Sequence, residues 1–174
     1  MRKQKIVEIK ELVEICKEKR NEGKQIVHCH GCFDLLHPGH IRHFKAAKKF
    51  GDILVVTITP DKFVRKGSGR PVFNAQLRIE TIAALEVVDY VSLNKWDTAV
   101  STIKSLKPDF YIKGNDYSDR SKDLTGNILL EEEAVKNGGG EIKFTNEISF
   151  SSTRIINKHY SILSDEAKDY INLA

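Results

Sequence analysis

Hydrophobic residues recur along this chain with two alternating spacings. Between residues 6 and 22, apolar side chains stand at Ile9, Leu12, Val13 and Cys16, a spacing that predicts a helix, and Gly23 favours its end. Short runs rich in β-branched residues, such as ILVVTIT at 53–59, predict buried strands instead. On these criteria, strands are predicted at 25–30, 53–59, 90–93, 110–113 and 141–145. Helices are predicted at 6–22, at 38–50, at 74–87 with Asn74 as cap, from an Asp97 cap to before Pro108, and at 127–137 and 151–160.

Strands that alternate with helices favour a parallel sheet with right-handed crossovers and helices on both faces. The expected fold class is therefore α/β, with a single Rossmann-like domain on a doubly wound, five-stranded parallel sheet. A length of 174 residues is close to that of one ordinary domain. We expect one domain over residues 1–174, with an N-terminal helix at 1–24, a core at 25–160 and a helical tail at 161–174.

Composition narrows the class of protein. With 40% hydrophobic and 30% charged residues, the chain is typical of a globular protein, and no apolar run approaches the length of a membrane span. The first twenty residues carry a charge every few positions, which predicts neither a secretory signal nor a transit peptide. Three cysteines without a framework spacing favour a reducing compartment, so we expect a cytoplasmic protein that binds no membrane. The net charge of +4 is spread along the chain, which suits phosphorylated small molecules and gives little support to nucleic-acid binding.

The predicted topology indicates where a ligand would bind. In a doubly wound sheet, ligands lie beyond the carboxyl ends of the strands, where the strand order reverses. The loops that follow strands are therefore candidates, at 31–40, 60–73, 113–126 and 146–153. The stretches 59–73 and 114–126 are dense in Gly, Asp, Ser, Lys and Arg, so we expect mobile flaps there.

The segment His37-Pro38-Gly39-His40 places two imidazoles at the start of a predicted helix. Gly31 would let the backbone approach a phosphate closely, Pro38 suits a first helical turn, and Gly39 would leave room between the imidazoles for a ligand. The helix N-terminus adds backbone donors and the positive end of a dipole, which favours a triphosphate. In the alternative interpretation, the two histidines only cap the helix or hydrogen-bond within the core.

The residues at 31–40, GCFDLLHPGH, resemble the GxFDxxHxGH signature of the cytidylyltransferase-like nucleotidyltransferases. Further stretches are similar to the heptose 1-phosphate adenylyltransferase domain, namely KGSGRP at 66–71, QLR at 76–78, ALEVVDYV at 84–91 and KGNDY at 113–117. SSTRII at 151–156 is similar to the closing Ser/Thr segment of the family. The sequence departs from the adenylyltransferase pattern at Asn115, where a second glycine is usual, and over 118–130.

The resemblance implies an enzyme that moves the NMP group of a nucleoside triphosphate, ATP by the closer pattern, to a phosphorylated sugar. The acceptor phosphate attacks the α-phosphorus in line and pyrophosphate leaves, so catalysis is mainly positioning and charge stabilisation. The resemblance places the catalytic residues His37 and His40 at the α-phosphate and Lys66 at the leaving pyrophosphate or the acceptor phosphate. Mg²⁺ is expected as a cofactor held mainly by the phosphates, with no metal site of the protein's own. Arg78 is a second basic clamp, unless it only makes an ion pair on the helix surface, and Lys66 is otherwise a solvated side chain.

Other nucleotide-binding residues are implied in the loops that follow strands. The segment 151–153 would bind the β- and γ-phosphates, unless it only caps a helix. Gly114 and Asp116 would face the nucleoside, with an Asx-type turn as the alternative. Asp34 would order its loop and help to place the metal, or only cap the loop. The residues expected to bind nucleotide are Gly31, Cys32, Phe33, Asp34, Gly39, Arg78, Lys113, Gly114, Asp116, Ser151, Ser152 and Thr153.

Several alternatives stay open. CTP-dependent transfer to glycerol or another polyol phosphate uses the same HPGH loop and terminal Ser/Thr segment. A non-catalytic nucleotide-binding module is a third function, against which the intact histidine pair argues. A homodimer, and a sugar kinase on another chain that makes the acceptor phosphate, are partners that the resemblance allows. A zinc site at His28, Cys29 and His30 is disfavoured, because alternation along a strand puts the histidines on one face and the cysteine on the other.

Overall fold

The computed structural model describes residues 4–67, 69–115 and 127–146 of the chain. Its five strands are β1 (Ile26–Gly31), β2 (Ile53–Ile58), β3 (Tyr90–Leu93), β4 (Phe110–Gly114) and β5 (Glu141–Thr145). They form one sheet in the order β3-β2-β1-β4-β5, and every neighbouring pair is parallel. The chain builds outward from β1 to β3 and then returns to the other side of β1, so the strand order reverses between β1 and β4.

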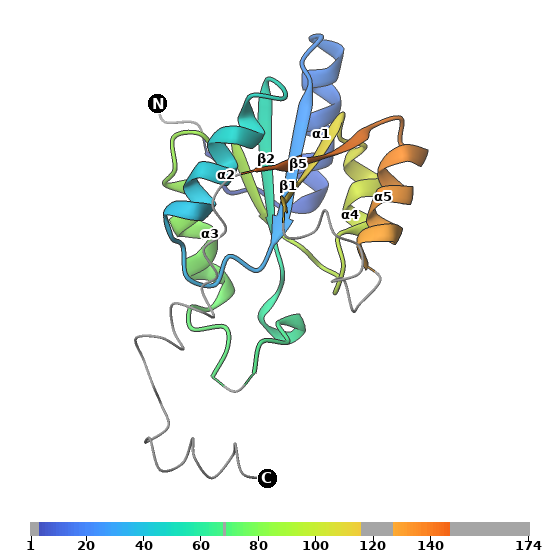
Figure 1. The fold of residues 1–174 in the computed structure, drawn as a ribbon. Coiled ribbons are helices and arrows are strands. Elements are labelled where there is room, and N and C mark those ends of the chain that lie inside the picture. Colours follow the sequence, from blue (N-terminus) through green and yellow to red (C-terminus); the bar gives the residue numbers. More distant parts are fainter. Residues whose placement is uncertain (1–3, 68, 116–126, 147–174) are drawn as a thin grey trace, which may run out of the picture.

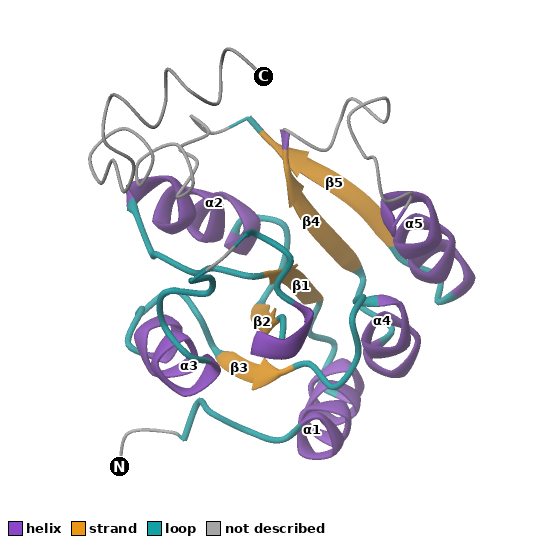
Figure 2. Cartoon of the chain, turned by 90° about the horizontal axis from the view of Figure 1, so that it is seen from below, coloured by secondary structure: helices purple, strands orange, loops and turns teal. Residues whose placement is uncertain are grey.

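Helices cover both faces of the sheet (Figures 1 and 2). They are α1 (Ile9–Asn21), α2 (Pro38–Lys48), α3 (Ala75–Ala83), α4 (Val100–Leu106) and α5 (Asn127–Asn137), with a short 3-10 helix, η1 (Asp61–Phe63). Helices α2 and α3 lie on one face, while α1, α4 and α5 lie on the other. This arrangement confirms the predicted fold class.

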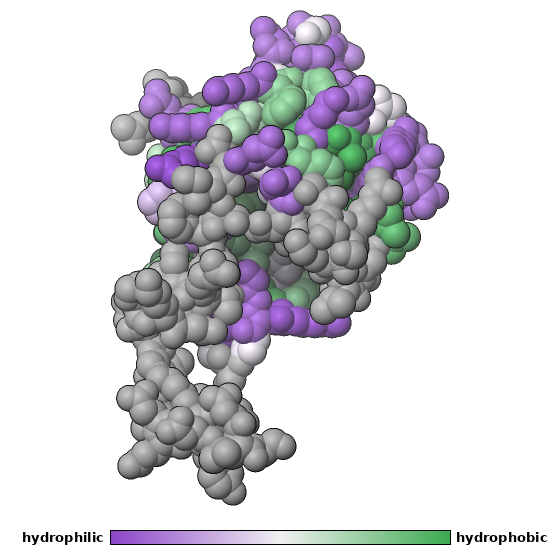
Figure 3. All heavy atoms as spheres, in the orientation of Figure 1, coloured by the Kyte–Doolittle hydropathy of each residue, from purple (hydrophilic) through white to green (hydrophobic). Residues whose placement is uncertain are grey.

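Alternating residues of β1 pack into different hydrophobic clusters. Val27 and Cys29 belong to the cluster that contains Phe44 of α2, whereas Ile26 packs with Leu12 of α1. Because side chains of a strand point alternately to its two faces, this pattern fixes the orientation of the whole strand. In the space-filling view, hydrophilic residues cover most of the helices and hydrophobic residues show between them (Figure 3).

Most predicted elements are confirmed, and their ends are less accurate. The strands predicted at 90–93 and 141–145 and the helix at 127–137 have the bounds that the structure gives. The Asn74 cap is also confirmed, since its Oδ1 accepts a hydrogen bond from the Leu77 amide at 3.0 Å, but the helix ends at Ala83 rather than near residue 87. The first helix starts at Ile9 instead of residue 6, because Ile6 forms an isolated parallel bridge with Val91.

The predicted cap at Asp97 is wrong. Helix α4 begins at Val100, and its N-cap position is Ala99. The preceding turn is held by buried Asn94, whose side-chain amide donates to the carbonyl oxygens of Trp96 and Thr98, both at 2.8 Å. Asp97 is thereby left exposed at the carboxyl edge of the sheet.

The helix predicted at 151–160 lies outside the described residues. Within them, every helix is too short or too polar to cross a membrane.

Candidate active site

The histidine pair stands where the topology predicts a ligand, directly after β1 and beside the point of strand reversal. Helix α2 begins at Pro38, so His37 is its N-cap residue and His40 lies in its first turn, and the carbonyl oxygen of His37 accepts the His40 amide at 2.9 Å. Their rings stack, with centroids 3.7 Å apart and planes at 19°. The idea that Gly39 leaves room for a ligand between the rings is therefore wrong. With the rings in this arrangement, a ligand would lie against the stacked pair.

The loop between β1 and α2 is shaped by Phe33. This residue adopts a left-handed φ of 47°, and its ring lies edge-on to His40, with centroids 5.3 Å apart, and against Phe44 at 5.0 Å. A Cβ on Gly31 would come within 3.0 Å of the Phe33 ring. Glycine at position 31 thus leaves room for this ring, which supports the histidines, and Gly31 also lines the cavity described below.

Asp34 organises the segment that leads into α3. Its side chain is fully buried, forms an ion pair with Arg70, and accepts the Val72 amide at 2.6 Å and the Phe73 amide at 3.4 Å. These contacts confirm that Asp34 orders a loop. Because both of its carboxylate oxygens are engaged, Asp34 is not in position to ligate a metal as it stands.

Arg78 joins three loops at the carboxyl edge of the sheet. It is 1% exposed, and its guanidinium donates to the carbonyl oxygens of Cys32 at 2.5 Å, Thr59 at 2.8 Å and Phe73 at 3.0 Å, and to the Asp61 carboxylate at 2.6 Å. The alternative of an ion pair on the helix surface is wrong, since the side chain is buried. In this structure, the guanidinium contacts the protein itself. The segment 59–73, which we expected to be a flap, is thus fastened at one end by Arg78 and at the other by Asp34.

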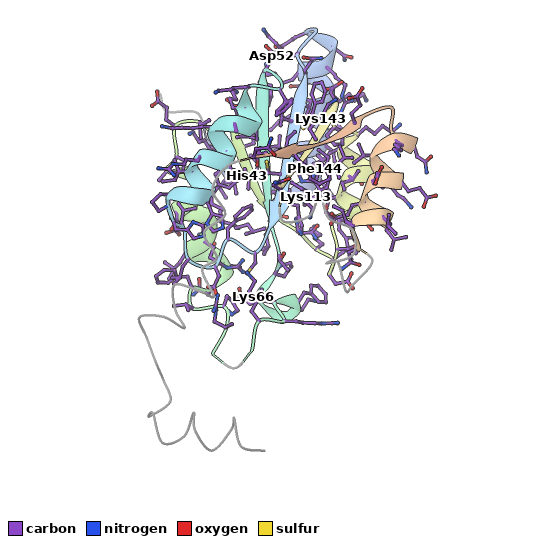
Figure 4. The ribbon with its side chains drawn as sticks, viewed as in Figure 1. His43, Asp52, Lys66, Lys113, Lys143 and Phe144 are labelled. Atoms are coloured by element: carbon purple, nitrogen blue, oxygen red, sulfur yellow. The ribbon has the colours of Figure 1, made fainter. Side chains whose placement is uncertain are left out.

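A cavity of about 370 Å³ opens at the same edge of the sheet. Its wall is formed by the ends of β1 and β4, the segment after β2, the loop after β3 and the start of α5. The lining residues are His30, Gly31, Cys32, Thr59, Phe63, Val64, Arg65, Lys66, Asp97, Thr98, Lys113, Asn127, Ile128 and Glu131. Figure 4 shows Lys113 near the strand ends and Lys66 on the segment beyond them. The cavity therefore combines basic side chains with several hydrogen-bonding groups.

Lys113 and Glu131 form an ion pair in the cavity wall. Their charged atoms lie 2.8 Å apart, and the side chains are 11% and 5% exposed. The same Glu131 oxygen, Oε2, accepts a hydrogen bond from the buried Tyr111 hydroxyl at 3.0 Å. Burial of two charges is tolerated only when they are paired and hydrogen-bonded, and this pair meets both conditions. The carboxylate is thus held in one orientation.

Behind the cavity, histidines and threonines form a buried network. The Thr57 hydroxyl lies 2.8 Å from both His28 Nε2 and His30 Nδ1, and because it has one hydrogen it can donate to only one of the two rings. His30 Nε2 is 3.3 Å from the Thr59 hydroxyl. Both histidines lie on one face of β1 and Cys29 on the other, as alternation predicted. Within the described ranges, no cluster of three His, Cys, Asp or Glu side chains could hold a metal ion.

Burial keeps four histidines uncharged. It is the largest cause that lowers the pKa of His28 and His40 to about 3, that of His43 to about 4, and that of His30 well below its ordinary value. The charges of His37, His43 and Lys66 lower the pKa of His40 further. We refer to His28, His30, His40 and His43 as the low-pKa histidines.

His43 connects α2 to the far side of the sheet. Its Nδ1 lies 2.8 Å from the Thr145 hydroxyl of β5, which in turn donates to the carbonyl oxygen of Lys113 at 3.4 Å. The hydroxyl must then accept from His43, so Nδ1 carries the ring hydrogen. This chain of contacts ties the helix that bears the histidine pair to the end of β4 (Figure 4).

The structure brings together part of the predicted site. Gly31, Cys32, Lys66 and Lys113 line the cavity, and a Cβ added to Gly114 would meet only open space. Four predicted residues lie outside the described residues, namely Asp116, Ser151, Ser152 and Thr153.

Sequence reasoning missed Glu131, Asp97, Thr98 and Asn127 as cavity residues. The loop after β3 ends at the same edge as the other candidate loops, and this signal was available. The positions of Asn127 and Glu131, four residues apart on one helix, also place them on one face.

Comparisons with known proteins agree with this architecture. A family model described as cytidylyltransferase-like matches residues 28–158. The bifunctional protein HldE of Campylobacter fetus is 40% identical over 157 residues, which cover 88% of this chain and 31% of that protein. HldE of Trichlorobacter lovleyi is 35% identical over 158 residues, or 89% of this chain and 31% of that protein. The chain thus spans about a third of the length of these curated relatives.

Solved structures show the same fold. A lipopolysaccharide core biosynthesis protein from Thermoplasma volcanium has a TM-score of 0.58 and 29% identity, with 74% of this chain and all of that chain covered. A pantoate-beta-alanine ligase from Francisella tularensis also reaches a TM-score of 0.58, covering 96% of this chain and 76% of that one. At 18% identity, this second likeness shows the fold alone.

Proposed function

Because this chain belongs to the cytidylyltransferase-like family of nucleotidyltransferases, we propose that it transfers AMP from ATP to a phosphorylated sugar, with heptose 1-phosphate as the first candidate. Pyrophosphate is the second product. The choice of ATP and of a heptose phosphate rests on the motifs at 66–71 and 113–117 and on identities of 35–40% to HldE.

The observation that carries the proposal is the place of Lys66. Its side chain is exposed and lines the cavity, and its charge is one of the causes that lower the pKa of His40. The charge of Lys66 therefore reaches both the cavity and His40. Such a position suits a reaction in which an acceptor phosphate in the cavity attacks a nucleotide phosphate beside the histidines.

In the proposed reaction, an oxygen of the acceptor phosphate forms a bond to the α-phosphorus while the bond from that phosphorus to the pyrophosphate oxygen breaks. The acceptor oxygen is already anionic, so no base is required. His37 and His40 donate hydrogen bonds to the α-phosphate as its charge develops, and Lys66 stabilises the pyrophosphate or the acceptor phosphate. Mg²⁺ fits as an ion that phosphate oxygens hold, since the buried Asp34 carboxylate is already engaged, and when bound it would neutralise phosphate charge.

The base would lie near Gly114, where a Cβ would meet nothing within 4 Å. Asn115 offers an amide that can both donate and accept, so recognition of cytosine instead of adenine would need few changes. CTP-dependent transfer to a polyol phosphate is therefore the second candidate. A homodimer, cytoplasmic localisation and a separate sugar kinase are further parts of the proposal that measurements on the protein itself must test.

The deciding experiment measures pyrophosphate release with each of four nucleoside triphosphates, Mg²⁺ and a panel of sugar and polyol phosphates. We expect release with ATP and heptose 1-phosphate, and a greater rise in melting temperature with ATP than with CTP at equal concentration. The His40→Ala variant supplies the background rate. Release with CTP and glycerol phosphate would replace the proposed function by the second candidate. Binding of nucleotide without release from any pair would indicate a non-catalytic module.

A further inference from the structure

Among the residues that the structure describes, protein contacts reach only one of the two oxygens of the Glu131 carboxylate in the cavity wall. Oε2 of Glu131 takes both the Tyr111 hydroxyl and the Lys113 ammonium group, at 3.0 and 2.8 Å. Within residues 4–67, 69–115 and 127–146, Oε1 accepts no hydrogen bond. Because Glu131 lines the cavity and its Oε2 holds both protein partners, Oε1 is the acceptor that a ligand in the cavity would reach.

The electrostatics of this carboxylate select the kind of group that it can bind. The paired Lys113 already balances its charge, so a second cation gains little, and an ionised phosphate has no hydrogen to donate to the carboxylate oxygen. A neutral donor such as a hydroxyl gains a charge-assisted hydrogen bond. The neighbouring lining residues Asp97, Thr98 and Asn127 can also hydrogen-bond to hydroxyl groups.

Basic side chains stand elsewhere in the wall of the same cavity. Arg65 and Lys66 follow β2 and are both exposed. A sugar phosphate would place its phosphate toward these residues and its hydroxyls toward α5.

We propose that Glu131 is a specificity-determining residue that accepts a hydrogen bond, through Oε1, from a sugar hydroxyl of the acceptor. This inference rests on the proposed function, because it assigns the cavity to the acceptor rather than to the nucleotide. It also fixes an orientation, with the hydroxyls of the acceptor at the Lys113–Glu131 pair and its phosphate near Lys66.

The test compares wild type with Glu131→Gln in steady-state kinetics. Glutamine has the same shape, and its carbonyl oxygen can still accept from Tyr111 and Lys113, but its NH₂ group then faces the cavity and cannot accept a hydrogen bond. We expect KM for heptose 1-phosphate to rise by about ten- to one-hundredfold, the effect of losing a hydrogen bond to a charged group, with KM for ATP unchanged. The control is Glu133→Gln, an exposed glutamate of the same helix, which should leave both constants unchanged.

Analogues of the acceptor that lack one hydroxyl identify the group that is bound. On wild type, one deoxy analogue should lose about the same factor in KM, whereas on Glu131→Gln it should lose nothing further, because the two changes remove the same interaction. A rise in KM for ATP with an unchanged acceptor KM would assign Oε1 to the ribose and overturn the proposal. If Glu131→Gln does not fold, equal KM values for all deoxy analogues on wild type would overturn it as well.

Binding of the acceptor separates this inference from the proposed function. Heptose 1-phosphate without ATP should raise the melting temperature of wild type, and this rise should be lost in Glu131→Gln. Protection without any turnover would refute the reaction and leave the hydroxyl contact in place. Absence of protection in wild type, or equal protection of the variant, would overturn the role of Glu131.

Discussion

Replacing Arg78 by methionine should cost a large part of the stability of the protein. Methionine keeps the unbranched apolar stem but removes the guanidinium, so the carbonyl oxygens of Cys32, Thr59 and Phe73 lose their donor. A buried acceptor left without a partner costs about 1–3 kcal/mol. The ion pair with Asp61 adds little, because that carboxylate is 43% exposed and water can replace the guanidinium.

Three such acceptors lie in one region and can relax together, so their costs do not add fully. We expect the free energy of unfolding to fall by about 3–5 kcal/mol, the lower part of the range that three unpaired acceptors at about 1–3 kcal/mol each would give. A domain of this size commonly has a stability of about 5–15 kcal/mol, so the variant should still fold at low temperature.

Urea denaturation followed by circular dichroism measures this loss. Arg42→Met on α2 is the matched control, since Arg42 is exposed and its replacement should change stability by less than about 0.5 kcal/mol. A loss below about 1 kcal/mol in Arg78→Met, with a raised KM for ATP, would refute the reasoning. That result would return Arg78 to the role of a phosphate clamp.

Three other changes test the site. His37→Ala and His40→Ala should each lower kcat by about 10²–10³-fold, the usual effect of losing a donor to the transition state, while thermal unfolding shows an intact fold; near-normal turnover in either variant would contradict the assignment. Lys66→Ala should lower kcat/KM in the pyrophosphate assay but change the free energy of unfolding by less than about 0.5 kcal/mol, because the side chain is exposed; unchanged kinetics would remove Lys66 from the mechanism. The free energy of unfolding should fall as pH drops below the ordinary histidine pKa of 6.5. In this range the histidines of the unfolded chain bind protons, whereas the low-pKa histidines of the folded protein stay uncharged. Urea titrations from pH 7 to pH 4 should show a slope of about 1.4 kcal/mol per pH unit for each proton taken up, and a flat profile would show that these histidines are charged in the fold.

Local patterns predicted the fold, because its elements are encoded by short stretches of sequence. The β-branched run at 53–59 and the helical spacing after Asn74 each need only neighbouring residues to be recognised. The failures at Ile6 and Asp97 have a common physical cause. Ile6 forms a bridge with a strand residue 85 positions away, so it does not join the helix. The turn that buried Asn94 holds keeps Asp97 away from the N-cap position. In both cases, long-range or buried contacts override the local preference.

The candidate site was predictable where its residues are adjacent in the chain. The segment after β1 carries the histidine pair in one run, whereas the Lys113–Glu131 pair joins a strand to a helix across 18 positions. The contact between Gly31 and the Phe33 ring was also beyond sequence reasoning, because it depends on the left-handed conformation of Phe33. Interpretation of a glycine in a phosphate motif thus needs the structure around it.

The low pKa of His40 has a consequence for the proposed reaction. At neutral pH the ring is uncharged, chiefly because of burial, and the positive charge of Lys66 lowers its pKa further. An anion placed against the ring favours its protonated form, so the pKa must rise as phosphate charge comes near. The interaction between His40 and the phosphates is therefore weak at first and strengthens as negative charge builds on the α-phosphate. An interaction that grows in the transition state accelerates the reaction, whereas one already complete in the bound substrate would only tighten binding. Burial of this histidine costs stability at low pH. The same burial keeps the ring uncharged before the reaction, so its interaction with the phosphates can strengthen as the transition state forms.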